Sequence, residues 1–128
     1  MILLWNSAAM MVQCTLVDGR GRYDYEWQAD RLLARDILSY LRDTLAIHGK
    51  TVDDVTQIGV FRGPGSFTGL RIGLSVLNTL ATARQLPIVG ATGDAWLSEC
   101  LERLDRQEND SIVMPDYGGD AHITKPRK

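Results

Sequence analysis

The segment from Gly63 to Gly73 reads GPGSFTGLRIG and combines glycines, two hydroxyl side chains and an arginine within eleven residues. A glycine-rich loop between a strand and a helix presents backbone N–H groups to an anion, which is the chemistry of phosphate binding. A loop serine beside a histidine would instead supply a nucleophile for hydrolysis. A loop that caps a helix and lets another backbone approach needs the same residues. Three roles therefore compete for this segment.

The named phosphate-binding motifs do not fit the loop. No lysine follows the final glycine as the P-loop requires, and Thr68 stands where the dinucleotide-binding pattern has its third glycine. A loose glycine pattern remains, which leaves contact with a nucleotide as one alternative beside capping and packing. The candidate nucleotide-contacting residues are Gly63, Gly65, Ser66, Thr68 and Arg71.

Hydrolytic chemistry finds little support in the sequence. Ser66 is not the centre of a G-x-S-x-G motif, and the only histidines are His48, at a predicted helix end, and His122, near the C-terminus. Cys14 and Cys100 lie far apart without a CxxC motif or a histidine pair, which predicts buried thiols rather than zinc ligands or a disulfide. We therefore expect no catalytic residue, no metal and no cofactor.

The composition is that of one ordinary domain. The chain has 128 residues, of which 45% are hydrophobic and 23% charged, with a net charge of −2. Such a charge does not draw a chain to nucleic acid or to an anionic membrane. No apolar run approaches the roughly 20 residues that cross a bilayer, and the first residues have no basic segment before an apolar one. We expect a cytoplasmic protein without membrane contact.

Hydrophobic periodicity predicts an α/β domain with a mixed sheet and flanking helices. The expected strands are residues 2–5, 11–17, 22–27, 57–61 and 86–90, and the expected helices are residues 30–47, 67–85 and 94–104. This order, βββαβαβα, places crossovers after the first three strands. The glycine loop then lies at the carboxyl end of a buried strand.

The helix expected at residues 67–85 is apolar on nearly every side, so more than one surface must cover it. Gly69 and Gly73 are four residues apart and share a helix face. They predict a flat strip that another helix can approach closely. In this interpretation the loop prepares a helix for a second protein.

The loop GPGSFTGLRIG, the helix to Gln85 and the segment LPIVG at residues 86–90 resemble the TsaB (YeaZ) family. The resemblance covers about residues 2–104. It implies the first lobe of an actin-like ATPase (ribonuclease H-like) fold, in a short form that lacks most of the second lobe. It also implies a non-catalytic scaffold subunit of the machinery that places threonylcarbamoyl on adenosine 37 of tRNA.

The same resemblance implies partners. A TsaD-like subunit would be bound and activated in a heterodimer, a TsaE-like ATPase is a further candidate, and tRNA would be reached through the complex. The chain alone would form a homodimer. Matched to the family's partner-binding helices, the expected contact residues are Leu33, Ile37, Leu41, Gly69, Gly73, Val76, Leu77 and Leu80.

One departure from the family pattern bears on catalysis. Active relatives of this superfamily end the first strand with an aspartate, whereas this sequence has Asn6, which offers magnesium no carboxylate. The alternatives to a scaffold are a small peptidase-like or nucleotide-hydrolysing enzyme, or a self-associating structural domain.

The sequence divides into a TsaB-like lobe at residues 1–108 and an extended basic C-terminal tail at residues 109–128. Pro115-Asp116-Tyr117 is similar to a proline-x-tyrosine segment near the family's C-terminus. Three roles stay open for the tail: contact with tRNA phosphates, a loose end, or a cover over apolar surface through Pro115 and Tyr117. The residues that make its end basic are His122, Lys125, Arg127 and Lys128.

Overall fold

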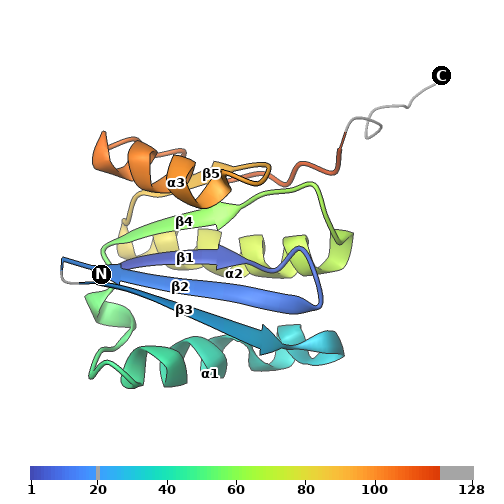
Figure 1. The fold of residues 1–128 in the computed structure, drawn as a ribbon, viewed down its shortest axis with the longest axis horizontal. Helices are drawn as coiled ribbons and strands as arrows, with labels where there is room; N and C mark the ends of the chain where they lie inside the picture. Colours follow the sequence, from blue (N-terminus) through green and yellow to red (C-terminus); the bar gives the residue numbers. More distant parts are fainter. Residues whose placement is uncertain (20, 119–128) are drawn as a thin grey trace.

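The computed structural model describes residues 1–19 and 21–118, which form a mixed sheet with helices on both faces (Figure 1). The strands are β1 (Ile2–Asn6), β2 (Met11–Asp18), β3 (Gly21–Gln28), β4 (Gln57–Phe61) and β5 (Ile88–Ala91). The helices are α1 (Leu33–Ala46), α2 (Phe67–Arg84) and α3 (Trp96–Asp105), with short 3₁₀ turns η1 (Asp30–Leu32) and η2 (Val52–Asp54). The predicted order βββαβαβα is confirmed, with element ends displaced by at most three residues.

The sheet has the strand order β3-β2-β1-β4-β5. The first three strands form an antiparallel meander, with Ile2 opposite Val17 in the β1–β2 pair. β4 and β5 are added in parallel, with Ile2 opposite Gln57 in the β1–β4 pair. Because β1 and β4 are parallel, their carboxyl ends meet at the same edge of the sheet. The loops that follow these two strands therefore lie side by side.

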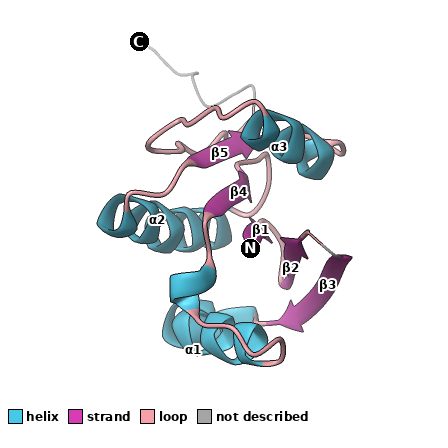
Figure 2. Cartoon of the chain, turned by 90° about the vertical axis from the view of Figure 1, so that its left-hand side faces the viewer, coloured by secondary structure: helices cyan, strands magenta, loops and turns pink. Residues whose placement is uncertain are grey.

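Alternate residues of the strands feed two cores, one on each face of the sheet. Figure 2 shows α1 and α2 on one face and α3 on the other. Leu3 and Trp5 of β1 face α1 and α2, whereas Leu4 between them packs with α3. Such burial on both faces explains why the predicted central strands are continuously apolar.

Helix α1 places one stripe of apolar side chains on the sheet. Its buried residues are Leu33, Ile37, Leu41, Thr44 and Leu45. The Tyr40 ring stacks on Trp27 of β3 with centroids 4.4 Å apart, which fixes the helix over the antiparallel part of the sheet. The predicted helix began at Asp30, but Asp30 has a φ of 52° and the α-helix begins only at Leu33.

The two cysteines are free and buried, as the sequence predicts. Cys14 belongs to the core beneath α1 and α2, and Cys100 to the core beneath α3, so the sheet separates them. Burial raises the pKa of each thiol to about 12. Both therefore stay protonated near neutral pH and behave as small apolar side chains.

Candidate functional site

The glycine loop is held by the end of β1. The Ser66 N–H donates to the carbonyl of Ala8 at 2.7 Å, and the Ser7 hydroxyl donates to the carbonyl of Gly69 at 2.8 Å. The indole N–H of Trp5 donates in turn to the Ser7 hydroxyl at 3.0 Å. Ser7 and Trp5 are buried, so these contacts join the two neighbouring loops into one rigid unit.

The prediction that Gly69 and Gly73 form a flat strip for a second protein is wrong. Gly73 is buried, and a Cβ atom on it would lie 2.6 Å from the indole nitrogen of Trp5 and would also collide with the Ser7 hydroxyl. A Cβ atom on Gly69 would meet the carbonyl oxygen of Ser7. Both glycines thus serve the close approach of α2 to the chain's own first strand.

The expected contact residues on the helices divide into two groups. Leu33, Ile37, Leu41 and Leu77 are buried in the chain's own core, so their assignment to a partner surface is corrected. The reason is that the sheet itself takes the apolar stripe of α1. Val76 and Leu80 are partly buried beside that core and keep surface exposed. They are the members of the predicted set that a partner can reach.

A groove of about 470 Å³ lies between α1 and α2. Its lining residues are Ala34, Phe67, Thr68, Arg71, Ile72, Ser75 and Val76. One helical turn beyond Ala34, Leu38 is 67% exposed, although it belongs to a helix whose apolar stripe faces the sheet. Sequence reasoning missed Leu38, whose signal was an apolar side chain on the otherwise polar side of α1.

The candidate nucleotide-contacting residues are not equally accessible. Gly63 is buried, has a φ of 131° that favours glycine, and has the carbonyl oxygen of Asp116 where a side chain would begin. Ser66, Thr68 and Arg71 are exposed, and so is Gly65. The Arg71 guanidinium lies 5.1 Å from the centre of the Phe67 ring. A ligand could therefore reach the loop from the α2 side but not at Gly63.

The described residues do not pair the loop serine with a histidine. His48 Nε2 lies 2.6 Å from the hydroxyl of Tyr25, and the His48 ring packs on Tyr23 with centroids 4.4 Å apart. His122 lies outside the described residues. Asn6 closes its own turn, because its side-chain oxygen accepts from the Ala8 N–H at 2.9 Å.

Within residues 1–19 and 21–118, no three or more His, Cys, Asp or Glu side chains gather in a way that would hold a metal ion. None of the helices in this part of the chain combines the length and apolar character needed to cross a membrane.

Residues 109–118, the C-terminal strap, begin by covering the free edge of β5. The Asp110 N–H donates to the carbonyl of Ile88 at 2.8 Å, and the Ile88 N–H donates to the Asn109 side chain at 3.1 Å. The Gly90 N–H donates to the Asp110 carboxylate at 2.9 Å. These bonds satisfy backbone groups that an unpaired edge strand would leave open.

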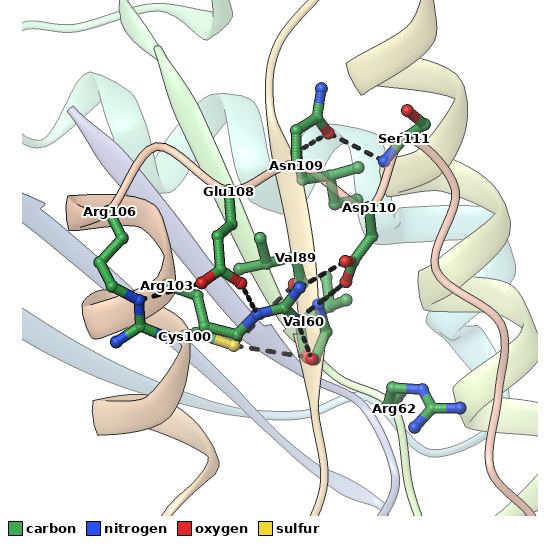
Figure 3. Close-up of polar contacts among 12 residues, drawn as sticks. Val60, Arg62, Val89, Cys100, Arg103, Arg106, Glu108, Asn109, Asp110 and Ser111 are labelled. Carbon is green, nitrogen blue, oxygen red and sulfur yellow. Dashed lines mark hydrogen bonds and ion pairs between the residues drawn. The ribbon is translucent and has the colours of Figure 1, made fainter.

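An ion cluster ties the start of the strap to α3 (Figure 3). Arg103 donates to the carboxylates of Asp110 and Glu108 and, at 2.8 Å, to the carbonyl of Gly90. Burial by itself raises the pKa of the Asp110 carboxyl, but hydrogen bonds from Arg103 and from the Gly90 N–H outweigh it and leave the pKa below its ordinary value. Hydrogen bonds to the carboxylates of Asp110 and Glu108 raise the pKa of Arg103 above its ordinary value.

The rest of the strap crosses α2 to the glycine loop. Val113 is buried, and its N–H and carbonyl both bond the Asn78 side chain at 2.9 Å. Arg62 Nε donates to the carbonyl of Met114 at 2.8 Å, and the Asp116 N–H donates to the carbonyl of Arg62 at 2.6 Å.

The described part of the predicted extended tail, residues 109–118, has no regular secondary structure but lies against β5, α2 and the glycine loop. Tyr117 packs on Phe67 of α2, whereas the cover alternative placed Pro115 and Tyr117 along the sheet. The basic residues His122, Lys125, Arg127 and Lys128 lie outside the described residues.

Comparisons with known proteins agree on one family. Residues 27–98 match the model of the family described as TsaD, tRNA N6-adenosine threonylcarbamoyltransferase. The tRNA threonylcarbamoyladenosine biosynthesis protein TsaB of Escherichia coli (strain K12) is 39% identical over 56 residues, which are 44% of this chain and 24% of that protein. TsaB of Haemophilus influenzae is 31% identical over 81 residues, 63% of this chain and 34% of that protein.

A transferase and a solved structure are also similar. The tRNA N6-adenosine threonylcarbamoyltransferase of Geobacter sulfurreducens is 37% identical over 97 residues, 74% of this chain and 28% of that protein. YeaZ from Pseudomonas aeruginosa superimposes with a TM-score of 0.68 at 28% identity, covering 83% of this chain and 49% of that one. The matches thus span from about a quarter to about half of the length of these relatives.

Proposed function

Because the chain belongs to the TsaD family, and within it to the TsaB (YeaZ) proteins, we propose that it takes part in making threonylcarbamoyladenosine in tRNA. Its mixed sheet with flanking helices is a single lobe of the actin-like (ribonuclease H-like) fold that the sequence predicts. The proposed role is that of a non-catalytic scaffold that binds and activates a TsaD-like transferase in the cytoplasm. A TsaE-like ATPase and tRNA would join through that complex.

The observation that carries this proposal is the groove between α1 and α2. Leu38 is 67% exposed beside it, and Val76 and Leu80 keep surface exposed along α2. Exposed apolar side chains along two neighbouring helices fit the apolar face of a third helix. A helix of the transferase placed there would bury these side chains and complete a bundle.

The arrangement of polar residues supports a role without catalysis. The hydroxyl of Ser7 is occupied by Trp5 and Gly69, and in the described residues Ser66 has no histidine partner. The side-chain oxygen of Asn6 already accepts a hydrogen bond from the Ala8 N–H. A nucleophile needs a base within hydrogen-bond reach, and these side chains offer none.

The proposal is tested by capture of a TsaD-like transferase from the same organism, co-expressed with the tagged chain. Leu38→Glu places a charge one helical turn from the groove, on the surface that the proposed helix would cover. It is expected to weaken capture at least tenfold, because a charge buried without a partner is costly. The matched control is Ile47→Glu, since Ile47 is also 67% exposed but follows the far end of α1. Ile47→Glu should bind as the parent chain does.

Three outcomes would contradict the proposal. The parent chain captures no transferase, or the Leu38 and Ile47 variants bind equally. In the third, the purified chain forms a stable dimer that the transferase does not dissociate, which would favour the self-associating domain. A purified chain that hydrolyses ATP or peptides would contradict the non-catalytic part alone.

A further inference from the structure

The two edges of the sheet differ in what covers them. The edge of β5 is covered by the strap, whose Asp110 N–H donates to the carbonyl of Ile88. β3 is the last strand at the opposite end, and among the described residues no segment pairs with its outer edge (Figure 2). Its ladder with β2 runs from Gly21 to Gln28 without a bulge. A long and regular free edge is a template for a further strand.

The backbone groups at this free edge belong to alternate residues of β3. The Ala29 N–H donates to the carbonyl of Met10 at 3.3 Å, so this pair, one step beyond Gln28 opposite Met11, is hydrogen-bonded. Bonded and non-bonded pairs alternate along an antiparallel ladder, so every second residue counted back from Ala29 bonds β2. The residues whose N–H and carbonyl groups point out from the free edge are therefore Arg22, Asp24 and Glu26.

The charged side chains of β3 lie on the face of the sheet opposite α1. Tyr25 and Trp27 pack with the core beneath α1 and α2, so the residues beside them along the strand project from the other face. On that face α3 packs on β4 and β5, and a groove of about 370 Å³ separates it from β3. The charged residues that line this groove are Arg22, Asp24, Glu26 and Asp94. Arg22 is thus the cation of a surface that is otherwise acidic.

Arg22 and Asp24 already form an ion pair along β3. Arg22 Nε donates to the two carboxylate oxygens of Asp24 at 3.1 and 3.2 Å, and the Thr15 hydroxyl donates to one of them at 2.7 Å. The hydrogen bonds from Thr15 and Arg22 lower the pKa of the Asp24 carboxyl, so it is ionised at neutral pH. Within the described residues Arg22 is bonded through Nε alone, so its terminal N–H groups can donate to a second carboxylate.

We propose that two copies of this chain pair through their β3 edges, antiparallel, about a two-fold axis at Tyr23. Arg22 of each copy then lies opposite Asp24 of the other, and both residues exchange backbone hydrogen bonds across the axis. The two Tyr23 side chains, each 37% exposed, meet on the face that carries α1. The two sheets thereby become one continuous sheet. This inference goes beyond the proposed function.

The charges on β3 select this register over its neighbours. Opposite residues of an antiparallel pair share a face, so the pairing can shift only in steps that keep the outward residues opposite each other. A shift in one direction places Arg22 opposite Arg22. A shift in the other direction places Arg22 opposite Glu26 but sets the two Asp24 carboxylates against each other. Like charges directly opposite are destabilising, so the self-complementary register identifies a second copy as the occupant of the edge.

The pairing is short and leaves the groove between α1 and α2 free. Only residues 21–25 of each copy face one another, whereas a standard interface has roughly 20–30 residues a side. Self-association should therefore be weak and should depend on concentration. The residues that line the groove belong to the two helices and none belongs to β3. A transferase helix and a second copy of the chain can thus be bound at the same time.

The test is sedimentation velocity of the full chain over a series of concentrations. The weight-average mass should rise from the 14.2 kDa of one copy toward twice that value. Arg22→Asp should weaken self-association about tenfold, because it sets like charges opposite each other at two places in a symmetric interface. The double variant Arg22→Asp/Asp24→Arg exchanges the two charges and should restore self-association to within about threefold of the parent chain.

The matched control is Arg106→Asp. Arg106 also belongs to an exposed ion pair, with Glu108 at 3.0 Å, but it follows α3, which packs on β4 and β5. This variant should associate as the parent chain does, and circular dichroism should show that all variants are folded. Amide hydrogen exchange at Arg22 and Asp24 should slow as the concentration rises. Exchange at Tyr23, whose N–H faces β2, should stay unchanged.

A chain that remains a single copy at every concentration would overturn the inference. Equal weakening by Arg22→Asp and Arg106→Asp would do so as well, and so would a double variant that associates no better than Arg22→Asp. Loss of self-association in Leu38→Glu would place the second copy on the groove instead. A chain that remains a single copy leaves the groove proposal standing, because capture of a transferase does not need the β3 edge. Failure of the capture assay likewise leaves the sedimentation result intact.

Discussion

The two faces of the sheet differ in how their helices are packed and how much apolar surface they leave exposed. On one face, Trp96, Cys100 and Leu104 of α3 are buried, and the ion cluster around Arg103 seals the helix to the strap. On the other face, α1 and α2 bury a larger core but leave a groove between them, and Leu38 of α1 is exposed one helical turn beyond it. A groove of about 520 Å³ also lies along α3, beside Leu101 and Leu104, so hollows occur on both faces. The difference is that, among the described residues, α1 and α2 carry largely exposed apolar side chains, Leu38 and Phe67, whereas α3 carries none. The face with exposed apolar side chains is therefore where we propose that a second molecule binds.

The largest effect is expected at Gly73, where α2 packs on Trp5 and Ser7. Gly73→Leu forces a side chain into the space of Trp5 and Ser7, so we expect a loss of about 3 kcal/mol in the free energy of unfolding. Urea denaturation of the purified variant measures it. The control is Ala83→Leu, an exposed position on the same helix, which should change little. Equal stability of the two variants would show that α2 does not pack on β1 as described.

The contact between α3 and the strap can be weakened at Arg103, which bonds Asp110 and Gly90. Arg103→Met removes the hydrogen bonds to Asp110 and Gly90 and leaves the partly buried carboxylate without its cation, for an expected loss of about 1–2 kcal/mol. Urea denaturation at pH 7 gives this value. No loss would indicate that the strap is held without the ion cluster.

The stability of Arg103→Met should also depend on pH differently from that of the parent chain. The pKa of Asp110 is lowered in the folded chain, so its contribution is present above the unfolded pKa of about 3.9 and is lost as pH falls through the folded pKa. Stability measured from pH 6 down to pH 2 should therefore fall less steeply for Arg103→Met than for the parent chain. Parallel curves would contradict this assignment of the shift.

The strap can be loosened at Asn78 with a smaller effect. Asn78→Ala removes both hydrogen bonds to the Val113 backbone, and we expect a loss of about 1 kcal/mol. Amide hydrogen exchange that is faster than in the parent chain at Val113, but unchanged at Leu104, would place the change in the strap. Thr79→Ala, on an exposed neighbouring position, is the control. Unchanged exchange at Val113 would mean that its burial alone holds the strap.

The open face should tolerate change. Leu38→Ser removes a side chain that is largely in water already, so the free energy of unfolding should change by no more than about 0.5 kcal/mol. Thermal unfolding followed by circular dichroism measures it. A loss above about 2 kcal/mol would show that Leu38 contributes to the chain's own core, and would weaken the groove as a partner site.

The order of elements and the α/β class followed from local pattern, whereas the actin-like fold was implied by the family resemblance. Short apolar and β-type runs between turns predicted the five described strands, and apolar residues at helical spacing predicted the three helices, because both signals lie in neighbouring residues. Local pattern did not show which surface each apolar helix face would contact. Leu33, Ile37 and Leu41 were predicted to meet a partner, yet the sheet takes them, since one apolar stripe packs equally well on a sheet or on another helix.

The sequence by itself determined that α2 needs cover on more than one side and that glycines at two of its positions allow a close approach. Only the tertiary structure decided what approaches: Trp5 and Ser7, more than sixty residues earlier in the chain, fill the space over Gly69 and Gly73. It also decided that Val113 and Tyr117 return to α2 and the glycine loop. Periodicity reports how much apolar surface a helix carries, but contacts between distant segments decide what covers it.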